Sequence, residues 1–583
     1  MKEQIIQAIA EAMQQLSSDG KIQGEFTGAA QVTRSKDPTH GDYASNIAMA
    51  SAKNVGLAPR QLAELLSDQL STCKLFEKIE IAGPGFINFF IAQKNYTQVI
   101  NNILSEKNNF GNNKDGDGQS IQLEYVSANP TGPLHVGHGR GAAYGATLAN
   151  LYKANGYKVH REYYVNDAGR QMDILATSVW LRYLELCGTE FTFPSNAYKG
   201  DYIWDIAATA HRTHGEKYLT DPICFKDSLP KDEPEGGDKE AYIDALIATA
   251  KEKLASQGYA IFFDLAIDTI LTDIKDDLHL FGVDYEQWYS ERSLFDTNRI
   301  NVVIEKLKAS DHVYEKNGAL WFASSNFGDE KDRVVVRDNG QPTYFASDIA
   351  YHVDKFSQGY SKIINIWGAD HHGYIARVRA ALKALGLDDT KLDILLVQFA
   401  NLYRGKVKQQ MSTRSGEFVT LRALRKEVGS DAARFFYVMR KSEQHLDFDL
   451  ELATSTSNEN PMYYVQYAHA RICSVLRQSE QALDIKSLNN LENLLSEDSE
   501  HTLMQKLADY PELIASSCKK QSPHLVVNYL RELAQKFHGY YNETQFLVDS
   551  KELRNARLLL IESTKHVLAN GLNILGVNAP EKM

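Results

Sequence analysis

The stretch SANPTGPLHVGHGRG, residues 127–141, decides the fold of this chain. It follows the short apolar run IQLEYV (121–126), which is typical of a strand, and it leads into a helical pattern that ends near residue 155. The run YKVHREYYV (157–165) predicts a second strand. Strand, helix and strand within about 45 residues form a βαβ unit, so we expect a parallel sheet with a right-handed crossover.

The same loop has residue types that suit phosphate chemistry. In open parallel sheets, ligands bind at the carboxyl ends of the strands, where helix N-termini present N–H groups. Gly137, Gly139 and Gly141 would let a nucleotide approach the backbone, and His135 and His138 would share one helix face. Two imidazoles there could stabilise a phosphoryl transition state. Glycine-rich turns before helices are common, and two histidines can also only cap and pack, so the glycines alone do not decide between these roles.

Length and composition exclude several classes of protein. At about 100–200 residues per domain, 583 residues predict three to four folding units. The five cysteines are far apart and form no C-x-x-C pair, which argues against a disulfide scaffold or a protein-held zinc and favours a reducing cytoplasm. The first residues have apolar positions at helical spacing and carry Glu3 and Glu11, so we expect a helix and not a signal peptide. No uninterrupted apolar run is long enough to span a membrane.

The charge balance first argues against a nucleic-acid partner. The formal net charge is −12, whereas phosphate binding depends on Lys and Arg. Residues 376–441, however, contain 14 Lys and Arg against 6 Asp and Glu, so an acidic chain carries a basic band. Residues 457–583 contain 13 against 15, so RNA recognition there would need particular aromatic and polar contacts.

The chain divides into three parts with different patterns. Residues 1–110 mix helix and strand signals and end at a polar, glycine-rich linker. Residues 118–455 carry the βαβ pattern, with an insertion expected over about 185–330, and residues 456–583 are helical throughout. We therefore expect a multidomain protein in which an α/β Rossmann-type core lies between an α+β N-terminal domain and an all-α C-terminal bundle.

Several motifs together resemble one enzyme family. PLHVGH resembles the H-I-G-H signature of class I aminoacyl-tRNA synthetases, and the surrounding EYVSANPTGPLHVGHGR is similar to that of bacterial arginyl-tRNA synthetases. The signature-type motif comprises Ala128, Asn129, Pro130, Thr131, Gly132, Pro133, Leu134, His135, Val136, Gly137 and His138. Further matching segments are YYVNDAGRQM (163–172), YFASDIAY (344–351), WGADHHGY (367–374), QMSTRSGEFVTLR (410–422), DAARFFY (431–437), QHLDFDL (444–450) and NPMYYVQYAHAR (460–471).

The resemblance implies an arginine–tRNA ligase. Arginine would attack the α-phosphate of ATP, supplied with Mg²⁺, to give arginyl-adenylate and pyrophosphate, and the terminal ribose of arginine tRNA would then accept the arginyl group. His135 and His138 would stabilise the reacting phosphate. ATP-binding residues implied by the family are Pro133, Leu134, His135, Val136, Gly137, His138, Gly368, Asp370, His371, Met411 and Ser412.

Arginine selection also has a physical argument. A guanidinium is always charged and is bound best by carboxylates. Glu124 ends the first strand, and Asp348 follows Tyr344 by four residues, so Asp348 and Tyr344 would share a helix face. We expect this pair at the guanidinium and Asn129 at the α-amino or carboxylate group. The arginine site implied by the family contains Glu124, Ser127, Asn129, His135, Tyr344 and Asp348.

One signature departs from the class pattern. Where class I enzymes have K-M-S-K-S, this chain has QMSTR (410–414), so neither lysine is in register. Lys406, Lys408 or Arg414 could supply the missing charge at the pyrophosphate. We expect Arg414, with Lys408 as the second candidate.

The flanking domains resemble tRNA-binding parts of the family. The N-terminal domain would contact the D-loop at the tRNA elbow, and the C-terminal bundle would bind the anticodon, with Tyr463, Tyr467 and His538 as candidates for base stacking. We expect a cytoplasmic monomer with no membrane partner. Three alternatives remain open: a nucleotidyltransferase that adenylates a small molecule, a non-catalytic RNA-binding relative, and a class I enzyme for cysteine. The first is normally much shorter, the second would lack the pocket histidines and carboxylates, and the third needs zinc-binding cysteines.

Overall fold

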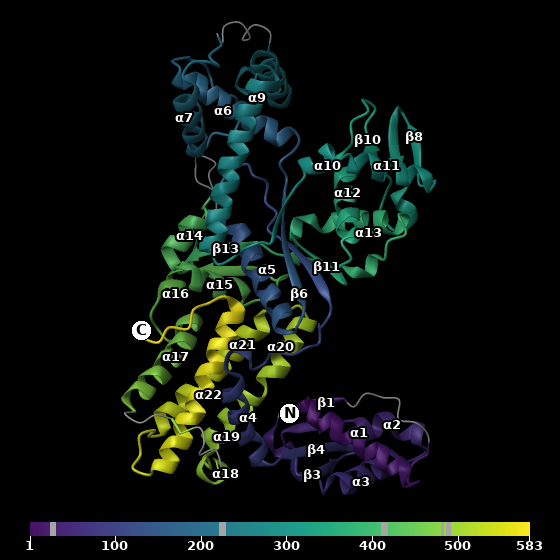
Figure 1. Ribbon diagram of the computed structural model, residues 1–583, viewed down its shortest axis with the longest axis vertical. Helices are drawn as coiled ribbons and strands as arrows, with labels where there is room; N and C mark the ends of the chain where they lie inside the picture. Colours follow the sequence, from purple (N-terminus) through teal and green to yellow (C-terminus); the bar gives the residue numbers. More distant parts are fainter. Residues whose placement is uncertain (24–30, 36, 221–228, 410–417, 480–482, 485–490) are drawn as a thin grey trace.

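The protein is elongated, with the central parallel sheet between two peripheral parts (Figure 1). The computed structural model describes residues 1–583 apart from 24–30, 36, 221–228, 410–417, 480–482 and 485–490. Helices α6, α7 and α9 extend from one end of the molecule, and the N-terminal domain lies at the other.

The N-terminal domain is a four-stranded antiparallel sheet of order β1-β2-β4-β3 packed with helices. Its first helix forms because Ile5, Ile9 and Leu16 recur on one face, and all three are buried. The elements are α1 (Lys2–Ser18), β1 (Val32–Arg34), β2 (Tyr43–Ser45), α2 (Ile47–Val55), α3 (Pro59–Leu70), β3 (Phe76–Ala82), β4 (Phe86–Ile91) and α4 (Gln93–Glu106).

The central sheet confirms the predicted Rossmann-type core. Its five strands are parallel in the order β12-β11-β5-β6-β7, and helix α5 (Val136–Ala154) connects β5 to β6. The strands are β5 (Ser120–Tyr125), β6 (Lys158–Val165), β7 (Gln287–Ser290), β11 (Lys362–Gly368) and β12 (Leu392–Val397). The first strand is central, and the carboxyl ends of all five open on one edge, where a ligand is expected.

A helical extension separates β6 from β7. It consists of α6 (Arg170–Leu186), α7 (Asp201–His214) and α9 (Lys239–Leu280), and α9 packs against both of the others. By length and composition alone, α9 could cross a membrane, which is weak evidence because core helices pass the same test. Strand β7 lies inside the range 185–330, where we expected one insertion. Its four residues are too few to show a period-two pattern, and the chain returns to the sheet there.

A small lobe lies between β7 and β11. It has its own hydrophobic core and an antiparallel sheet of order β10-β9-β8. Its elements are α10 (Arg292–Asp296), α11 (Arg299–Ala309), β8 (Val313–Lys316), β9 (Ala319–Phe322), β10 (Arg333–Val336) and α12 (Tyr344–Ser357). Helix α13 (Ile375–Ala384) packs on α12 after the chain has passed through β11.

The remaining chain forms a connecting layer and then a helical bundle, as expected. The layer comprises β13 (Ala400–Arg404), β14 (Val407–Lys408), α14 (Leu421–Val428), α15 (Ser430–Val438), β15 (Leu446–Asp449) and α16 (Leu450–Thr454). The bundle comprises α17 (Pro461–Gln478), α18 (Leu491–Leu494), α19 (Asp498–Ala508), α20 (Tyr510–Lys519), α21 (His524–Glu543) and α22 (Lys551–Leu575).

One buried arginine joins three of these parts. Arg434, on α15, is 1% exposed and donates to the carbonyl of Leu575 at the end of α22 and to those of Phe281 and Gly282 after α9. Burial lowers the pKa of its guanidinium to about 10, which still leaves it charged at neutral pH. Arg434 therefore fixes the bundle and the helical extension relative to the connecting layer.

Replacing this arginine tests the connection. Arg434→Leu should lower the free energy of unfolding by about 3 kcal/mol, because three carbonyl groups lose a charged donor. Differential scanning calorimetry should show a lower unfolding midpoint, whereas Arg212→Leu, at an exposed position on α7, should leave it unchanged. Equal midpoints for Arg434→Leu and the unchanged protein would contradict this account.

Candidate active site

A cavity of about 310 Å³ lies at the carboxyl edge of the central sheet. Its walls come from the ends of β5, β6, β7 and β11 and from helix α12, as expected for a Rossmann-type core. The lining includes seven residues named from the sequence as arginine or nucleotide contacts: Glu124, Ser127, Asn129, Tyr344, Asp348, Gly368 and His371.

The turn after β5 has a strained backbone, which directs the Ser127 side chain toward Glu124. Val126 and Ser127 both have positive φ, 70° and 42°, and the Ser127 N–H donates to the Tyr125 carbonyl at 3.0 Å, which closes a γ-turn. A β-branched residue in this conformation costs about 1–3 kcal/mol. The turn brings the Ser127 hydroxyl to Glu124 Oε1, to which it donates at 3.0 Å, and the same hydroxyl accepts the Tyr164 N–H at 3.1 Å.

The two histidines cap helix α5 and stack on each other. His135 Nδ1 accepts the Gly137 N–H at 3.1 Å, His138 Nδ1 accepts the His135 N–H at 3.3 Å, and the ring centroids are 3.6 Å apart. Each ring therefore carries its proton on Nε2, which remains as a donor for a ligand. Burial lowers the pKa of both, that of His138 to about 3, so both are neutral at physiological pH. The capping role and a ligand-binding role are compatible.

The histidine loop is joined to the segment that follows the second signature. The Val136 N–H donates to the Val419 carbonyl and the Leu421 N–H to the Leu134 carbonyl, at 3.0 and 2.7 Å. The Phe418 ring also lies 5.3 Å from that of His135. Gln410, Met411, Ser412 and Arg414 lie outside the described residues, and Lys408 is exposed on β14, the strand that leads into them.

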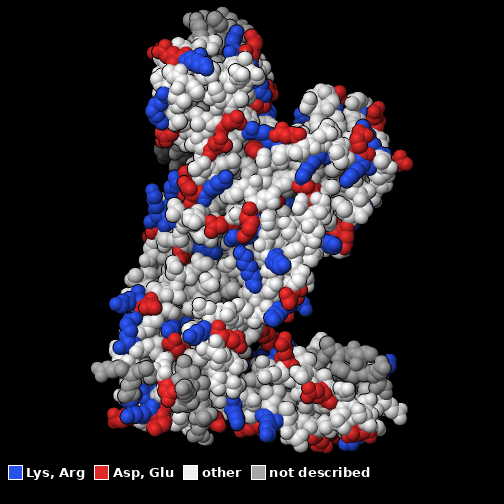
Figure 2. Space-filling view, in the orientation of Figure 1, with Lys and Arg blue, Asp and Glu red and all other residues white. Residues whose placement is uncertain are grey.

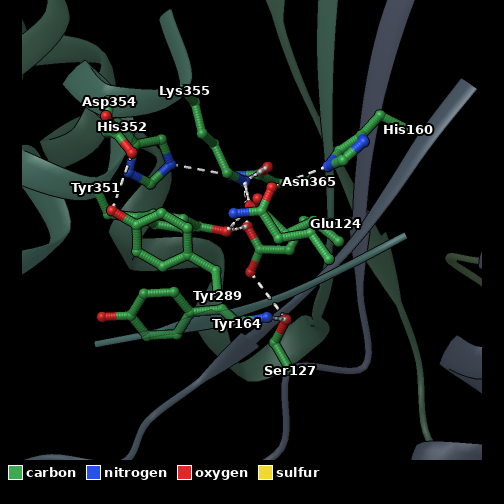
Figure 3. Close-up of polar contacts among 12 residues, drawn as sticks. Glu124, Ser127, His160, Tyr164, Tyr289, Tyr351, His352, Asp354, Lys355 and Asn365 are labelled. Atoms are coloured by element: carbon green, nitrogen blue, oxygen red, sulfur yellow. Dashed lines mark hydrogen bonds and ion pairs between the residues drawn. The ribbon is translucent and has the colours of Figure 1, made fainter. Parts of the chain in front are cut away.

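Glu124 already has a cation inside the protein. Lys355 Nζ lies 2.5 Å from Glu124 Oε2, and the Tyr351 hydroxyl donates to the same oxygen at 3.1 Å (Figure 3). Burial would raise the pKa of Glu124, but the Lys355 charge holds it below the usual range. Glu124 is therefore ionised before any ligand arrives.

Two other carboxyl groups of the cavity have no such cation. Asp348 and Glu291 form no ion pair with any described residue, and Glu291 Oε2 is buried without a hydrogen-bond partner. Burial raises the pKa of Asp348 to about 7, with the Glu124 charge adding to the shift, and raises that of Glu291 to about 8, with Asp348 and Asp167 adding. The part of the cavity that Asp348 and Glu291 line thus has no positive charge from the described residues.

Glu291 and Tyr164 are site residues that the sequence did not indicate. Glu291 directly follows β7 and is 3% exposed, and the Tyr164 hydroxyl, near the end of β6, is buried without a partner in the described part of the chain. The signal for Glu291 would have been its place at a strand end. Asn129, by contrast, was named and is held at the rim by Gln171 and Asn166.

The candidates for nucleotide binding lie on two segments. Gly368 ends β11, and Asp370 and His371 follow on an exposed 3-10 turn, where their side chains lie 3.5 Å apart. On the histidine loop, Leu134 and Val136 are buried, so only their backbone could contact a ligand. A Cβ on Gly137 would lie 2.9 Å from the His135 ring, which explains glycine there.

The proposed RNA contacts differ in accessibility. Tyr463 and Tyr467 stack on the partly exposed side of α17, whereas His538 is 7% exposed and its ring contacts Arg471 and the Tyr464 carbonyl. His538 is therefore placed to orient its neighbours more than to stack on a base.

Part of the basic band forms ion pairs within the protein. Arg379, Arg404, Arg422 and Arg425 all form ion pairs with acidic side chains. Figure 2 shows positive and negative side chains interleaved over the face in view. The sequence predicted a basic band over 376–441, and part of its charge is paired with acids, some of them elsewhere in the chain, such as Asp277.

Comparisons with known proteins agree with this geometry. Successive parts match family models described as arginyl tRNA synthetase N terminal domain (3–91), tRNA synthetases class I (R), catalytic domain (99–186 and 255–457) and DALR anticodon binding domain (465–583). An arginine–tRNA ligase of Thioalkalivibrio sulfidiphilus is 58% identical and one of Legionella pneumophila (strain Paris) is 54% identical, each over the full length of both chains. The structure of Thermus thermophilus arginyl-tRNA synthetase, at 22% identity, has a TM-score of 0.74 over the whole of both chains and supports the fold.

The parallel sheet with a histidine-capped helix at its carboxyl edge, and the domains attached to it, define a class I aminoacyl-tRNA synthetase. The two relatives are identical to this chain at more than half of all positions over their full length, and this identifies the family within that class. The chain belongs to the arginyl-tRNA synthetase family.

Proposed function

We propose that this protein is an arginine–tRNA ligase that forms arginyl-adenylate from L-arginine and ATP and transfers the arginyl group to the 3′-terminal adenosine of arginine tRNA. In the first step a carboxylate oxygen of arginine attacks the α-phosphorus and pyrophosphate leaves. In the second, the ribose hydroxyl attacks the activated carbonyl and AMP leaves. The observation that carries the proposal is that two carboxyl groups of the cavity, Asp348 and Glu291, have raised pKa values and no ion pair among the described residues.

Arginine would complete the charge of the cavity. Its guanidinium would pair with Asp348 and Glu291, which both line the cavity, with Tyr344 at the rim, because a planar cation with several donors can pair with two carboxylates. Glu124, Ser127 and Asn129 would hold the α-amino and carboxylate end, with His135 nearby. A neutral side chain of the same shape would leave two carboxyl groups buried without a partner, which disfavours it.

ATP would lie between the histidine loop and the turn after β11. The neutral rings of His135 and His138 can donate Nε2–H to phosphate oxygens, and charge builds on those oxygens in the transition state. Gly368, Asp370 and His371 would bind the ribose and base end. Mg²⁺ would arrive with ATP and neutralise phosphate charge, and the cation beside the pyrophosphate would be Arg414 or Lys408.

The flanking domains would bind tRNA. We assign contact with the tRNA elbow to residues 1–110, catalysis to 118–455 and anticodon recognition to 456–583, where Tyr463 and Tyr467 offer stacking surfaces. We further propose that the protein acts as a monomer in the cytoplasm.

A charging assay tests the reaction. Purified protein given ATP, Mg²⁺, tRNA and each amino acid in turn should charge arginine alone. His138→Ala should lower adenylate formation at least a hundredfold, because a transition-state donor is lost, with little change in tRNA binding. Charging of another amino acid, or none with arginine, would overturn the proposal.

Glu291→Gln tests the arginine pocket. The variant keeps the shape of the side chain but removes its charge, so the KM for arginine should rise about tenfold or more while the KM for ATP stays the same. Glu305→Gln, an exposed residue on α11, is the matched control. An unchanged KM for arginine in Glu291→Gln would remove Glu291 from the site.

A further inference from the structure

A buried lysine lies behind the proposed arginine site. Lys355, in the last turn of α12, is 2% exposed, and its Nζ lies 2.5 Å from Glu124 Oε2, 3.8 Å from Glu162 Oε1 and 2.9 Å from Asn365 Oδ1. Figure 3 shows Lys355, Glu124 and Asn365 converging between the helix and the sheet. The proposed reaction does not use Lys355 directly, yet a buried lysine is costly unless it is paired.

A chain of hydrogen bonds fixes the position of this lysine. His352 Nδ1 donates to the Asp348 carbonyl at 2.8 Å, and its Nε2 accepts from the Asn365 amide at 2.9 Å. The Asn365 carbonyl oxygen in turn accepts from Lys355. These roles require a neutral imidazole, and burial indeed lowers the pKa of His352 to about 4. The backbone of Asp348 is therefore linked to the lysine that pairs with Glu124.

Lys355 pairs with two carboxylates, of which only one lines the cavity. Glu162 Oε1 accepts the Tyr351 hydroxyl at 2.5 Å and does not line the cavity, whereas Glu124 lines it and keeps Oε1 directed at Ser127. A buried carboxyl group that loses its cation takes up a proton. Protonated Glu124 would then be a poor acceptor for a substrate ammonium or guanidinium group.

We propose that Lys355 is a positioning residue for arginine binding, which acts by keeping Glu124 ionised and oriented toward the cavity. The inference rests on the proposed function, because it takes arginine as the ligand of the cavity. Lys355 itself contacts no substrate in this account. The ionisable groups around Glu124 come from α12, from β6 and from the residues on either side of β7: Lys355, His352, Asp348, Tyr351, Glu162, Tyr164, Tyr285 and Glu291.

Lys355→Met tests the inference. The KM for arginine should rise about tenfold or more, with the KM for ATP and kcat changed less than about threefold. The acidic limb of the pH profile of kcat/KM for arginine, to which Asp348 and Glu291 already contribute, should also become steeper and extend to higher pH, because Glu124 would then have to lose a proton as well. A purely structural role would not move that limb. Lys362→Met removes a partly exposed lysine of β11 that pairs with Asp393 of β12; it is the matched control and should behave like the unchanged protein.

A second variant tests whether misfolding of Lys355→Met could explain its effect. Lys355→Met with Glu162→Gln removes one charge of each sign, so the buried net charge is kept. In this double variant the KM for arginine should remain raised and the acidic limb should remain shifted, because Glu124 still lacks its cation. Wild-type values of both in either folded variant would overturn the proposal. If the proposed function itself is wrong, the unchanged protein will not charge tRNA with arginine, and this result is separate from those of the variants.

Discussion

One buried lysine lies among four carboxyl groups near the carboxyl edge of the central sheet and pairs with only two of them, and most of the site depends on this imbalance. Lys355 neutralises Glu124, with Glu162 close by, while Asp348 and Glu291 retain raised pKa values and no ion pair among the described residues. Such an arrangement is unfavourable in an empty cavity, because each buried charge costs solvation. It becomes favourable when a ligand brings a cation of the right shape. Under the proposed function, the site would select arginine because arginine supplies the positive charge that the cavity lacks.

The fold supplies these groups from distant parts of the sequence. Parallel strands bring their carboxyl ends to one edge, so Glu124, Asn166 and Glu291 meet although β7 lies far along the chain from β5. Backbone hydrogen bonds join the histidine loop to residues 419–421. Arg434 links the bundle to the connecting layer through its hydrogen bond to the Leu575 carbonyl, and the Tyr437 hydroxyl of the same helix donates to the Val136 carbonyl of the histidine loop.

The sequence predicted those features that depend on local pattern or on a motif. The βαβ unit, the helical C-terminal part and the position of Asp348 and Tyr344 on one helix face all have such signals. Strand β7 has only four residues, so Glu291 could not be recognised as a strand-end residue. Lys355 has the sequence pattern of an ordinary surface lysine, and its burial follows only from how α12 packs. The ion pairs of Arg422 and Arg425 with Asp277 likewise depend on the tertiary structure and have no signal in the local sequence.

The most direct test of the central claim is the number of protons exchanged when arginine binds. Carboxyl groups with pKa values of about 7 and 8 hold protons at pH 7, and pairing with a guanidinium ionises them. Affinity for arginine should therefore rise with pH until both groups are ionised. Isothermal titration calorimetry at pH 7, in buffers of different ionisation enthalpy, should report release of about one proton per arginine bound. A binding enthalpy that does not depend on the buffer would show that both groups are already ionised and would contradict the account.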